Sequence, residues 1–221
     1  MLNISSRIAT CVFVALVLSA NCYAVVVKDL YSAEVPVADK TQAALTAGSK
    51  VALSEVLVKV SGRSEVLQNS VLQAAIGNSR GLVQQYAYTR QADESGVLQA
   101  RFEFDVAVIS DLVASAGAPL WTANRPAVLV WMVLEGPAGK AYLNRETSAE
   151  MTTRVTEEFA RRGVPVQFPL YDLNDAAAIS VDELWRLNAG SLSGASQRYG
   201  VNDILAGRLA TLSNGSWVGD W

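Results

Sequence analysis

Apolar and polar residues follow two different spacings along the chain, and together these spacings predict a mixture of strands and helices. In residues 98–106, apolar side chains alternate with polar ones, which is typical of a strand with one buried and one solvated face. Residues 40–60 place apolar side chains at helical spacing, and Gly62 follows as a stop signal. Residues 127–134 are apolar on both faces, which predicts a central strand that is covered on both sides.

The elements group into a first α/β unit over residues 25–117 and a second over residues 126–221, with a linker at 118–125. In the first unit we expect strands at 25–31, 86–91 and 98–106, a turn at 93–96, and helices at 40–60, 70–77 and 108–117. The 70–77 helix begins with Ser70 and Gln73 at capping-box spacing.

The second unit is predicted to run β-α-β-α-β-β, an order that favours a mixed sheet with helices packed on it. We expect strands at 127–134, 164–170, 203–212 and 216–221, a loop at 136–144, and a helix from 146 to 163. Ser180 and Glu183 form a capping box that starts a further helix. Asn214-Gly215 is a type I′ hairpin signal. The predicted fold class is therefore α/β (α+β), built as two small mixed-sheet units.

The first 24 residues read as a signal peptide. Arg7 precedes an apolar run over 8–20, and small residues at Cys22 and Ala24 stand at −3 and −1 of a cleavage site before Val25. This pattern predicts export to the periplasm. Two alternatives remain open: an uncleaved inner-membrane anchor over 8–27, and lipidation at Cys22.

Composition removes most catalytic chemistry. The chain has 221 residues, a net charge of −3 and no histidine, and its only cysteines are Cys11 and Cys22 in the leader. The absence of histidine excludes a Ser-His-Asp triad and a histidine-ligated zinc site. Once the leader is cleaved, no cysteine remains, which excludes thiolate zinc sites and iron–sulfur sites. Without a basic surplus, nucleic acid is not an expected partner. We therefore expect no catalytic residue, metal or cofactor.

The motifs that remain have ordinary structural interpretations. Residues 77–81 match G-x-S-x-G, but a helix precedes them and histidine is absent, so we interpret Ser79 as the N-cap of a helical turn. Residues 136–140 resemble a phosphate loop only faintly and read as a Gly/Pro turn. Asp172 and Asp175 could contact a hard cation, but we favour turn formers.

Glu103 and Asp105 are a candidate acid–base pair. They share one face of the predicted strand, about 7 Å apart, a spacing compatible with glycoside cleavage. Arg101 lies on the same face and would hold Glu103 ionised. We favour a solvated charged face.

Tryptophans and one arginine are the candidate binding residues. Trp131 and Trp185 lie in apolar patterns and are expected in the core. Trp121 is expected to pack between the units, with Arg125 as a charged contact in the groove there. Trp217 and Trp221 are four residues apart on the last strand and could form one binding surface.

Five segments carry a resemblance to a known family, and they follow one another over most of the chain after the leader. They are VLVKVSG (56–62), VQQY (83–86), LWTANRPAVLVW (120–131), RGVPV (162–166) and RYGV (198–201). They resemble the bacterial family called domain of unknown function 2066. The resemblance implies an exported protein of Gram-negative bacteria with no established activity, whose members continue beyond the point where this chain stops. We therefore expect the second unit to be incomplete at its C-terminus.

Three functions compete. The preferred hypothesis is a non-enzymatic cell-envelope module that binds a protein or a cell-wall component. The second is a hydrolase of envelope polysaccharide that uses Glu103 and Asp105. The third is a small-ligand binder that uses the groove between the units and Arg125.

Overall fold

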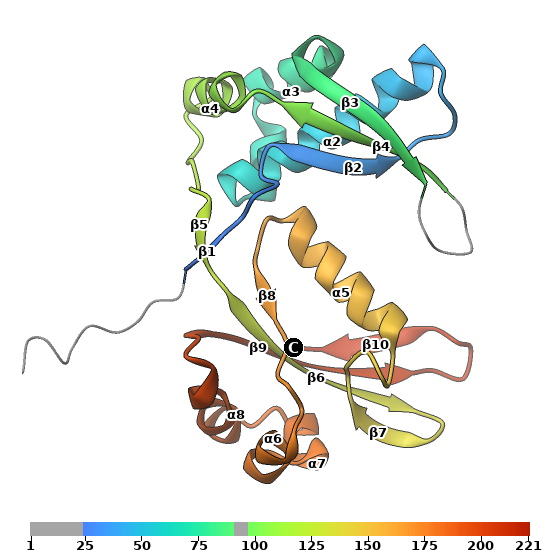
Figure 1. The fold of residues 1–221 in the computed structure, drawn as a ribbon, viewed down its shortest axis with the longest axis vertical. Coiled ribbons are helices and arrows are strands. Elements are labelled where there is room, and N and C mark those ends of the chain that lie inside the picture. Colours follow the sequence, from blue (N-terminus) through green and yellow to red (C-terminus); the bar gives the residue numbers. More distant parts are fainter. Residues whose placement is uncertain (1–23, 91–96) are drawn as a thin grey trace, which may run out of the picture.

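The computed structural model describes residues 24–90 and 97–221. It has an α+β fold in which two sheets, each covered by helices, lie one above the other (Figure 1), so the predicted class is confirmed. A short ribbon of β1 (Ala24–Val26) and β5 (Asn124–Pro126) lies between them. Residues 1–23 of the leader predicted over 1–24, and the turn predicted at 93–96, lie outside the described residues.

The first unit packs helices against one face of an antiparallel sheet of order β2-β4-β3. Its elements are β2 (Ser32–Pro36), α2 (Gln42–Ser61), η1 (Ser64–Gln68), α3 (Ser70–Gly77), η2 (Ser79–Leu82), β3 (Val83–Arg90), β4 (Leu98–Phe104) and α4 (Val106–Ser115). On β4, Ala100, Phe102 and Phe104 are buried in a core that they share with α2. The polar residues between them lie on the opposite face, as the alternation predicted.

The second unit is built around β6 (Val128–Gly136), which pairs in parallel with β8 (Val166–Gln167) and β9 (Asp203–Thr211). The other elements are β7 (Gly139–Tyr142), α5 (Ala149–Arg161), α6 (Leu173–Ala178), α7 (Val181–Trp185), α8 (Ala189–Ser196), η3 (Gln197–Tyr199) and β10 (Trp217–Asp220). The predicted β-α-β-α-β-β order is present, with β7 added as a hairpin after β6.

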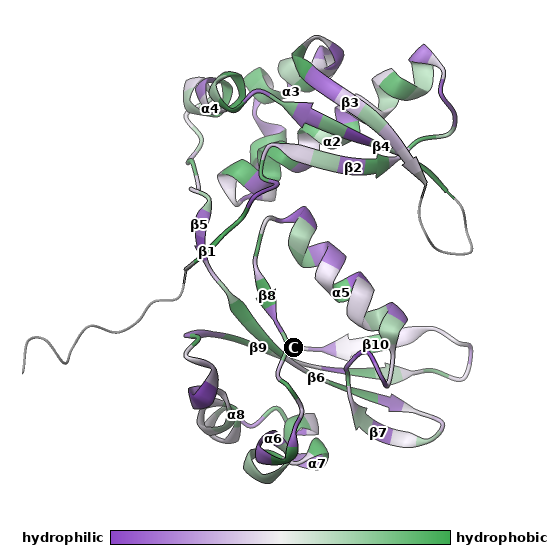
Figure 2. Ribbon diagram, viewed as in Figure 1, coloured by the Kyte–Doolittle hydropathy of each residue, from purple (hydrophilic) through white to green (hydrophobic). Residues whose placement is uncertain are grey.

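Both faces of β6 are covered, which confirms that it is a central strand. Leu129 and Trp131 pack in a core with residues of α7 and α8, whereas Val130 and Met132 pack in a second core with α5. Figure 2 shows the difference in pattern: β6 is mainly apolar, whereas α5 alternates between apolar and polar residues along its length. The capping box at Ser180 is also present, with both of its hydrogen bonds.

Two strand predictions are wrong. Of the strand predicted at 25–31, only Val25 and Val26 lie in a strand, the short β1. The strand of the sheet, β2, begins at Ser32, because the inward alternation of Ala33, Val35 and Val37 selects the later segment. The strand predicted at 98–106 ends at Phe104, and Val106 begins α4 with 56% of its surface exposed.

Two further predictions about the second unit need correction. Only Val166–Gln167 of the predicted 164–170 strand pairs with β6, since Pro165 and Pro169 flank it. The turn at Asn214-Gly215 is not type I′, which needs positive φ at both central residues. Among the described residues only Gly215 of this pair has a positive φ (80°), and its N–H donates to the Leu212 carbonyl at 2.9 Å, as in a three-residue hairpin loop.

Candidate functional site

Arg125 lies on β5 at the junction of the two units and has no exposed surface. Its Nε donates to the Thr122 carbonyl at 2.9 Å, and its Nη1 donates to the Gly163 carbonyl at 2.7 Å. Its Nη2 donates to the carbonyls of Lys59 at 2.7 Å and Trp121 at 2.9 Å. One side chain therefore binds the first unit, the linker and the second unit.

The counter-charge for Arg125 comes from backbone carbonyls, since no salt bridge to it is formed within the described ranges. Lys59 belongs to the last turn of α2, and Gly163 follows the end of α5. Carbonyls at a helix C-terminus carry negative partial charge. Burial lowers the pKa of the guanidinium, but arginine remains protonated in proteins.

Trp121 fixes the linker against the first unit. Its ring lies under the Arg125 guanidinium, 3.9 Å from it, and the backbone N–H of Trp121 donates to the Val60 carbonyl at 2.7 Å. The ring also covers Gly62, which ends α2 with φ of 72°; a Cβ at Gly62 would lie 2.8 Å from the ring. Glycine is therefore required at this position by both backbone conformation and space.

The four predicted binding residues lie in two places: Trp121 and Arg125 at the junction of the units, and Trp217 and Trp221 at β10. A ligand contact by Arg125 needs an accessible guanidinium, and the one in the structure is enclosed and fully hydrogen-bonded. Trp217 and Trp221 are 45% and 79% exposed on and beside the outer strand β10. Binding by these two tryptophans stays a prediction.

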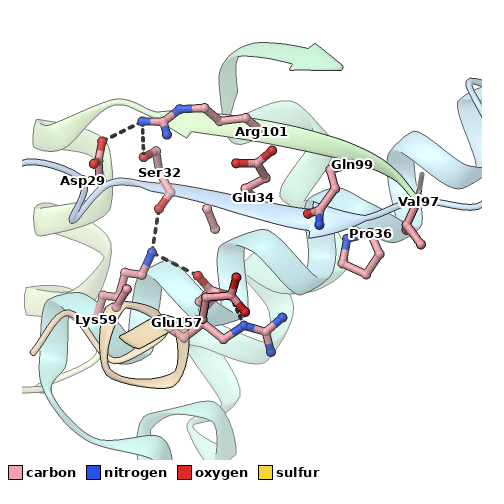
Figure 3. A pocket seen from close by; sticks show the side chains of 13 residues that line it. Asp29, Ser32, Glu34, Pro36, Lys59, Val97, Gln99, Arg101 and Glu157 are labelled. Atoms are coloured by element: carbon pink, nitrogen blue, oxygen red, sulfur yellow. Dashed lines mark hydrogen bonds and ion pairs between the residues drawn. The ribbon is translucent and has the colours of Figure 1, made fainter. Parts of the chain in front are cut away.

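A groove of about 710 Å³ lies between the first unit and α5 (Figure 3). One wall is β2 with the start of β4, the floor is α2, and the opposite wall is the C-terminal half of α5. The lining residues are Asp29, Ser32, Ala33, Glu34, Pro36, Glu55, Lys59, Val97, Gln99, Arg101, Glu157, Ala160 and Arg161.

Charged side chains of opposite sign are paired inside this groove. Lys59 Nζ lies 3.0 Å from the Glu55 carboxylate and donates to the Ser32 carbonyl at 2.9 Å. Across the groove, Arg161 Nε lies 4.0 Å from Glu55.

Closer to the rim, Arg101 pairs with Asp29 at 2.6 Å, and this bond raises the pKa of the guanidinium. Glu34 accepts a hydrogen bond from Thr89. Neither Glu34 nor Glu157 forms a salt bridge with the side chains that the structure describes. The unpaired charges of the groove are thus both negative.

The candidate acid–base pair is not assembled. Asp105 is the N-cap of α4 and accepts from the N–H groups of Ala107 at 2.9 Å and Val108 at 3.0 Å. Glu103 contacts Arg101 at 3.3 Å on the outer face of the sheet, and neither carboxylate lines the groove. Asp105 is used to hold a helix terminus, which the strand pattern did not reveal.

The other sequence motifs have structural roles. The expected N-cap role of Ser79 is wrong: Asn78 precedes the turn, and Ser79 is fully buried with its Oγ 2.9 Å from Ser49 Oγ. Residues 136–140 are the turn between β6 and β7, as predicted, and Lys140 pairs with Asp182 at 3.2 Å.

Asp172 and Asp175 bind an arginine in the same unit. Asp172 caps α6 and lies 2.7 Å from Arg198, which together lower the pKa of Asp172 to about 2. Asp175 is fully buried, lies 3.0 Å from Arg198 and accepts from the Tyr199 hydroxyl at 2.5 Å. Burial and this bond raise the pKa of Tyr199 to about 12. Over residues 24–90 and 97–221, no group of three acidic side chains is placed to hold a metal ion.

Sequence reasoning predicted a groove between the units but missed the residues that line it, because its walls come together only in the tertiary fold. One signal was available: Glu55 and Lys59 are charged residues four positions apart on an otherwise apolar stretch of α2. Such a pair inside a buried helix needs a polar neighbour, here the edge of β2 and Arg161.

Residues 24–122 match a domain of unknown function (DUF8605). The DUF8605 region spans β1 to the linker and so includes β2 and α2 of the groove but not α5. The resemblance to domain of unknown function 2066 is wrong, because the match is to a different family. The short segments that carried the resemblance, such as VLVKVSG, are shaped by helix and strand packing that many α/β proteins share.

Comparison with curated proteins and with solved structures gave no match. Within the described part of the chain, no helix is long and apolar enough to cross a membrane.

We expect Arg125→Met to destabilise the protein by at least about 3 kcal/mol, since several buried carbonyls lose their donor at about 1–3 kcal/mol each. Urea unfolding of the whole chain measures this. Arg161→Met is the matched control: its side chain is 52% exposed, and the expected change is within about 0.5 kcal/mol. An equal effect of both variants would contradict the role given to Arg125.

The pKa of Asp172 is lowered in the folded state from 3.8 to about 2, so its contribution to stability is present above pH 3.8 and is lost as the pH falls towards 2. We expect the Asp172→Asn variant to be less stable than the parent at pH 6. The difference in their free energies of unfolding should become small near pH 2, about four pH units lower. Asp203→Asn, at an exposed position of the same unit, is the control for the change in net charge. Urea midpoints over the pH series test this, and a constant difference for Asp172→Asn would contradict it.

Proposed function

We propose that this protein is exported to the periplasm and acts there as a non-enzymatic recognition module of the cell envelope, which binds its partner in the groove between its two units. The observation that carries this proposal is the groove of about 710 Å³ itself. Pockets that bind small molecules commonly have volumes of about 300–1,000 Å³, and the groove has room for a ligand or side chains of a partner of that size. The signal-peptide pattern of residues 1–24 supports export.

Recognition is favoured over catalysis by the residues available. The sequence contains no histidine, and no cysteine follows Cys22. The carboxylates with the best spacing for hydrolysis, Glu103 and Asp105, are engaged by Arg101 and by the α4 N-terminus. This use weighs against the polysaccharide hydrolase alternative.

A small-ligand binder is the second candidate, and the size of the groove favours it. Its charged contacts would be Arg101 and Arg161, which are 37% and 52% exposed, in place of the enclosed Arg125. A partner could also use the exposed Trp217 and Trp221, which lie on the other unit from β2.

If residues 1–24 direct export, the mature protein begins at Val25 and is found in the periplasmic fraction. Cell fractionation followed by intact-mass measurement tests this. A Cys22→Arg variant places a large charge at −3 and should accumulate as the uncleaved form. A full-length chain that stays in the cytoplasm, or one that remains uncleaved in the inner membrane, would contradict the proposal.

Filling the groove should remove partner binding. Ala160 lines the groove from α5 and is exposed, so Ala160→Trp should reduce cross-linking to the partner in intact cells at least about tenfold by excluding it sterically. Ala177→Trp, at an exposed position of α6, is the matched control and should cross-link as the parent does. Cross-links unaffected by Ala160→Trp would place the partner elsewhere and refute groove recognition.

A further inference from the structure

β2 is an edge strand whose free side borders the groove. In the sheet order β2-β4-β3, no described strand pairs with the other side of β2. Ser32, Ala33, Glu34 and Pro36 all line the groove. The Ala33 side chain is only 2% exposed and belongs to the core, so the strand presents its backbone to the groove as well as its side chains.

The pairing with β4 fixes which backbone groups face outwards. The Phe104 N–H donates to the Tyr31 carbonyl at 2.9 Å, and the Val37 N–H donates to the Leu98 carbonyl at 3.0 Å. In an antiparallel ladder alternate residues direct their N–H and C=O groups to opposite sides. The odd-numbered residues of β2 therefore face β4, and Glu34 directs both of its backbone groups away from it, towards the groove.

Two features restrict this edge to a short site. At one end, Lys59 Nζ already donates to the Ser32 carbonyl at 2.9 Å. At the other end, Pro36 has no N–H to offer. Lysine and proline at such positions limit uncontrolled strand pairing. Between them, Glu34 has both a backbone N–H and a backbone C=O directed towards the groove.

The opposite wall of the groove is a helix. Glu157, Ala160 and Arg161 of α5 line the groove together with Glu55 and Lys59 of α2. Figure 3 shows Glu157 and Lys59 on the same side of β2. A groove between an edge strand and a helix is a recurring site for extended peptides, which add a strand by backbone hydrogen bonds and place side chains against the helix.

The charges in the groove indicate the side chain that such a peptide carries. Lys59 and Arg101 are neutralised by Glu55 and Asp29. The two carboxylates without a salt bridge to a described side chain, Glu34 and Glu157, stand on the two opposite walls. A basic side chain would complement them.

We propose that an extended segment of a protein partner, carrying a lysine or arginine, adds to β2 at Glu34 and places its basic side chain beside Glu34 or Glu157. This inference rests on the proposed function and names its occupant: the segment exchanges backbone hydrogen bonds with the N–H and C=O of Glu34.

The probe is the capped, fluorescently labelled peptide TVTKTVT, and its binding to the whole protein is followed by anisotropy. We expect TVTKTVT to bind, and TVTETVT to bind at least about tenfold more weakly because of charge repulsion. Methylation of the lysine backbone nitrogen removes a strand donor and should also weaken binding at least about tenfold.

The matched variants are Glu34→Pro and Glu34→Ala. Proline removes the N–H that faces the groove but no ladder bond to β4, so the strand can persist at the edge. Alanine keeps that N–H and loses only the carboxylate. We expect Glu34→Pro to lose peptide binding and Glu34→Ala to retain it within about fivefold, with thermal unfolding of both checked against the parent.

Strand addition is overturned if TVTKTVT does not bind, if N-methylation has no effect, or if both Glu34 variants bind alike. These outcomes leave the proposed function intact when Ala160→Trp still abolishes cross-linking in cells. If Ala160→Trp has no effect on either cross-linking or TVTKTVT binding, both proposals fail together.

Discussion

The buried guanidinium of Arg125 sets the relative position of the two units. Enclosing a charge away from water costs several kcal/mol unless hydrogen bonds replace its hydration. Here the replacement comes from carbonyls of α2, the linker and the segment after α5. Because these carbonyls belong to both units, the cation is fully solvated by the protein only when both helix ends converge on it. The groove beside the junction exists as a consequence of that convergence.

Two glycines make this convergence sterically feasible. Gly62 follows α2 and Gly163 follows α5, and both have left-handed backbone, with φ of 72° and 65°. A Cβ at Gly163 would lie 2.5 Å from Arg125 Nη1, and one at Gly62 would meet the Trp121 ring. The helix stop signals therefore serve two purposes: they end the helices and they leave room for the linker side chains.

Local patterns in the sequence predicted the parts of the fold that local physics decides. The apolar face of α2, the two-sided burial of β6 and the capping box at Ser180 are all readable from spacing. β2 was missed because its pattern of Ala33, Val35 and Val37 is short and follows a competing apolar stretch at 25–27. Asp105 was placed on a strand because the alternation continues to Val106, two residues past the real end of the strand, where Asp105 instead caps a helix.

The lining of the groove was beyond sequence reasoning because it joins residues that are far apart in the chain. Glu55 and Arg161 approach to 4.0 Å only after both units have folded and docked. The predicted groove contact, Arg125, lies at the junction of the units but is enclosed there by backbone carbonyls. A single arginine flanked by Trp121 and Pro126 does not reveal whether it faces a ligand or the carbonyls of two helix ends.

The bond between the units also differs from an ordinary salt bridge in its response to acidity. Arginine keeps its proton, and backbone carbonyls have none to gain, so neither side of the Arg125 contact titrates in the range where proteins normally work. The ion pairs on the groove walls depend on carboxylates such as Asp29 and Glu55. The frame of the groove is therefore held by one set of groups, and the charges that a ligand would meet are supplied by another, so architecture and ligand preference rest on separate chemistry.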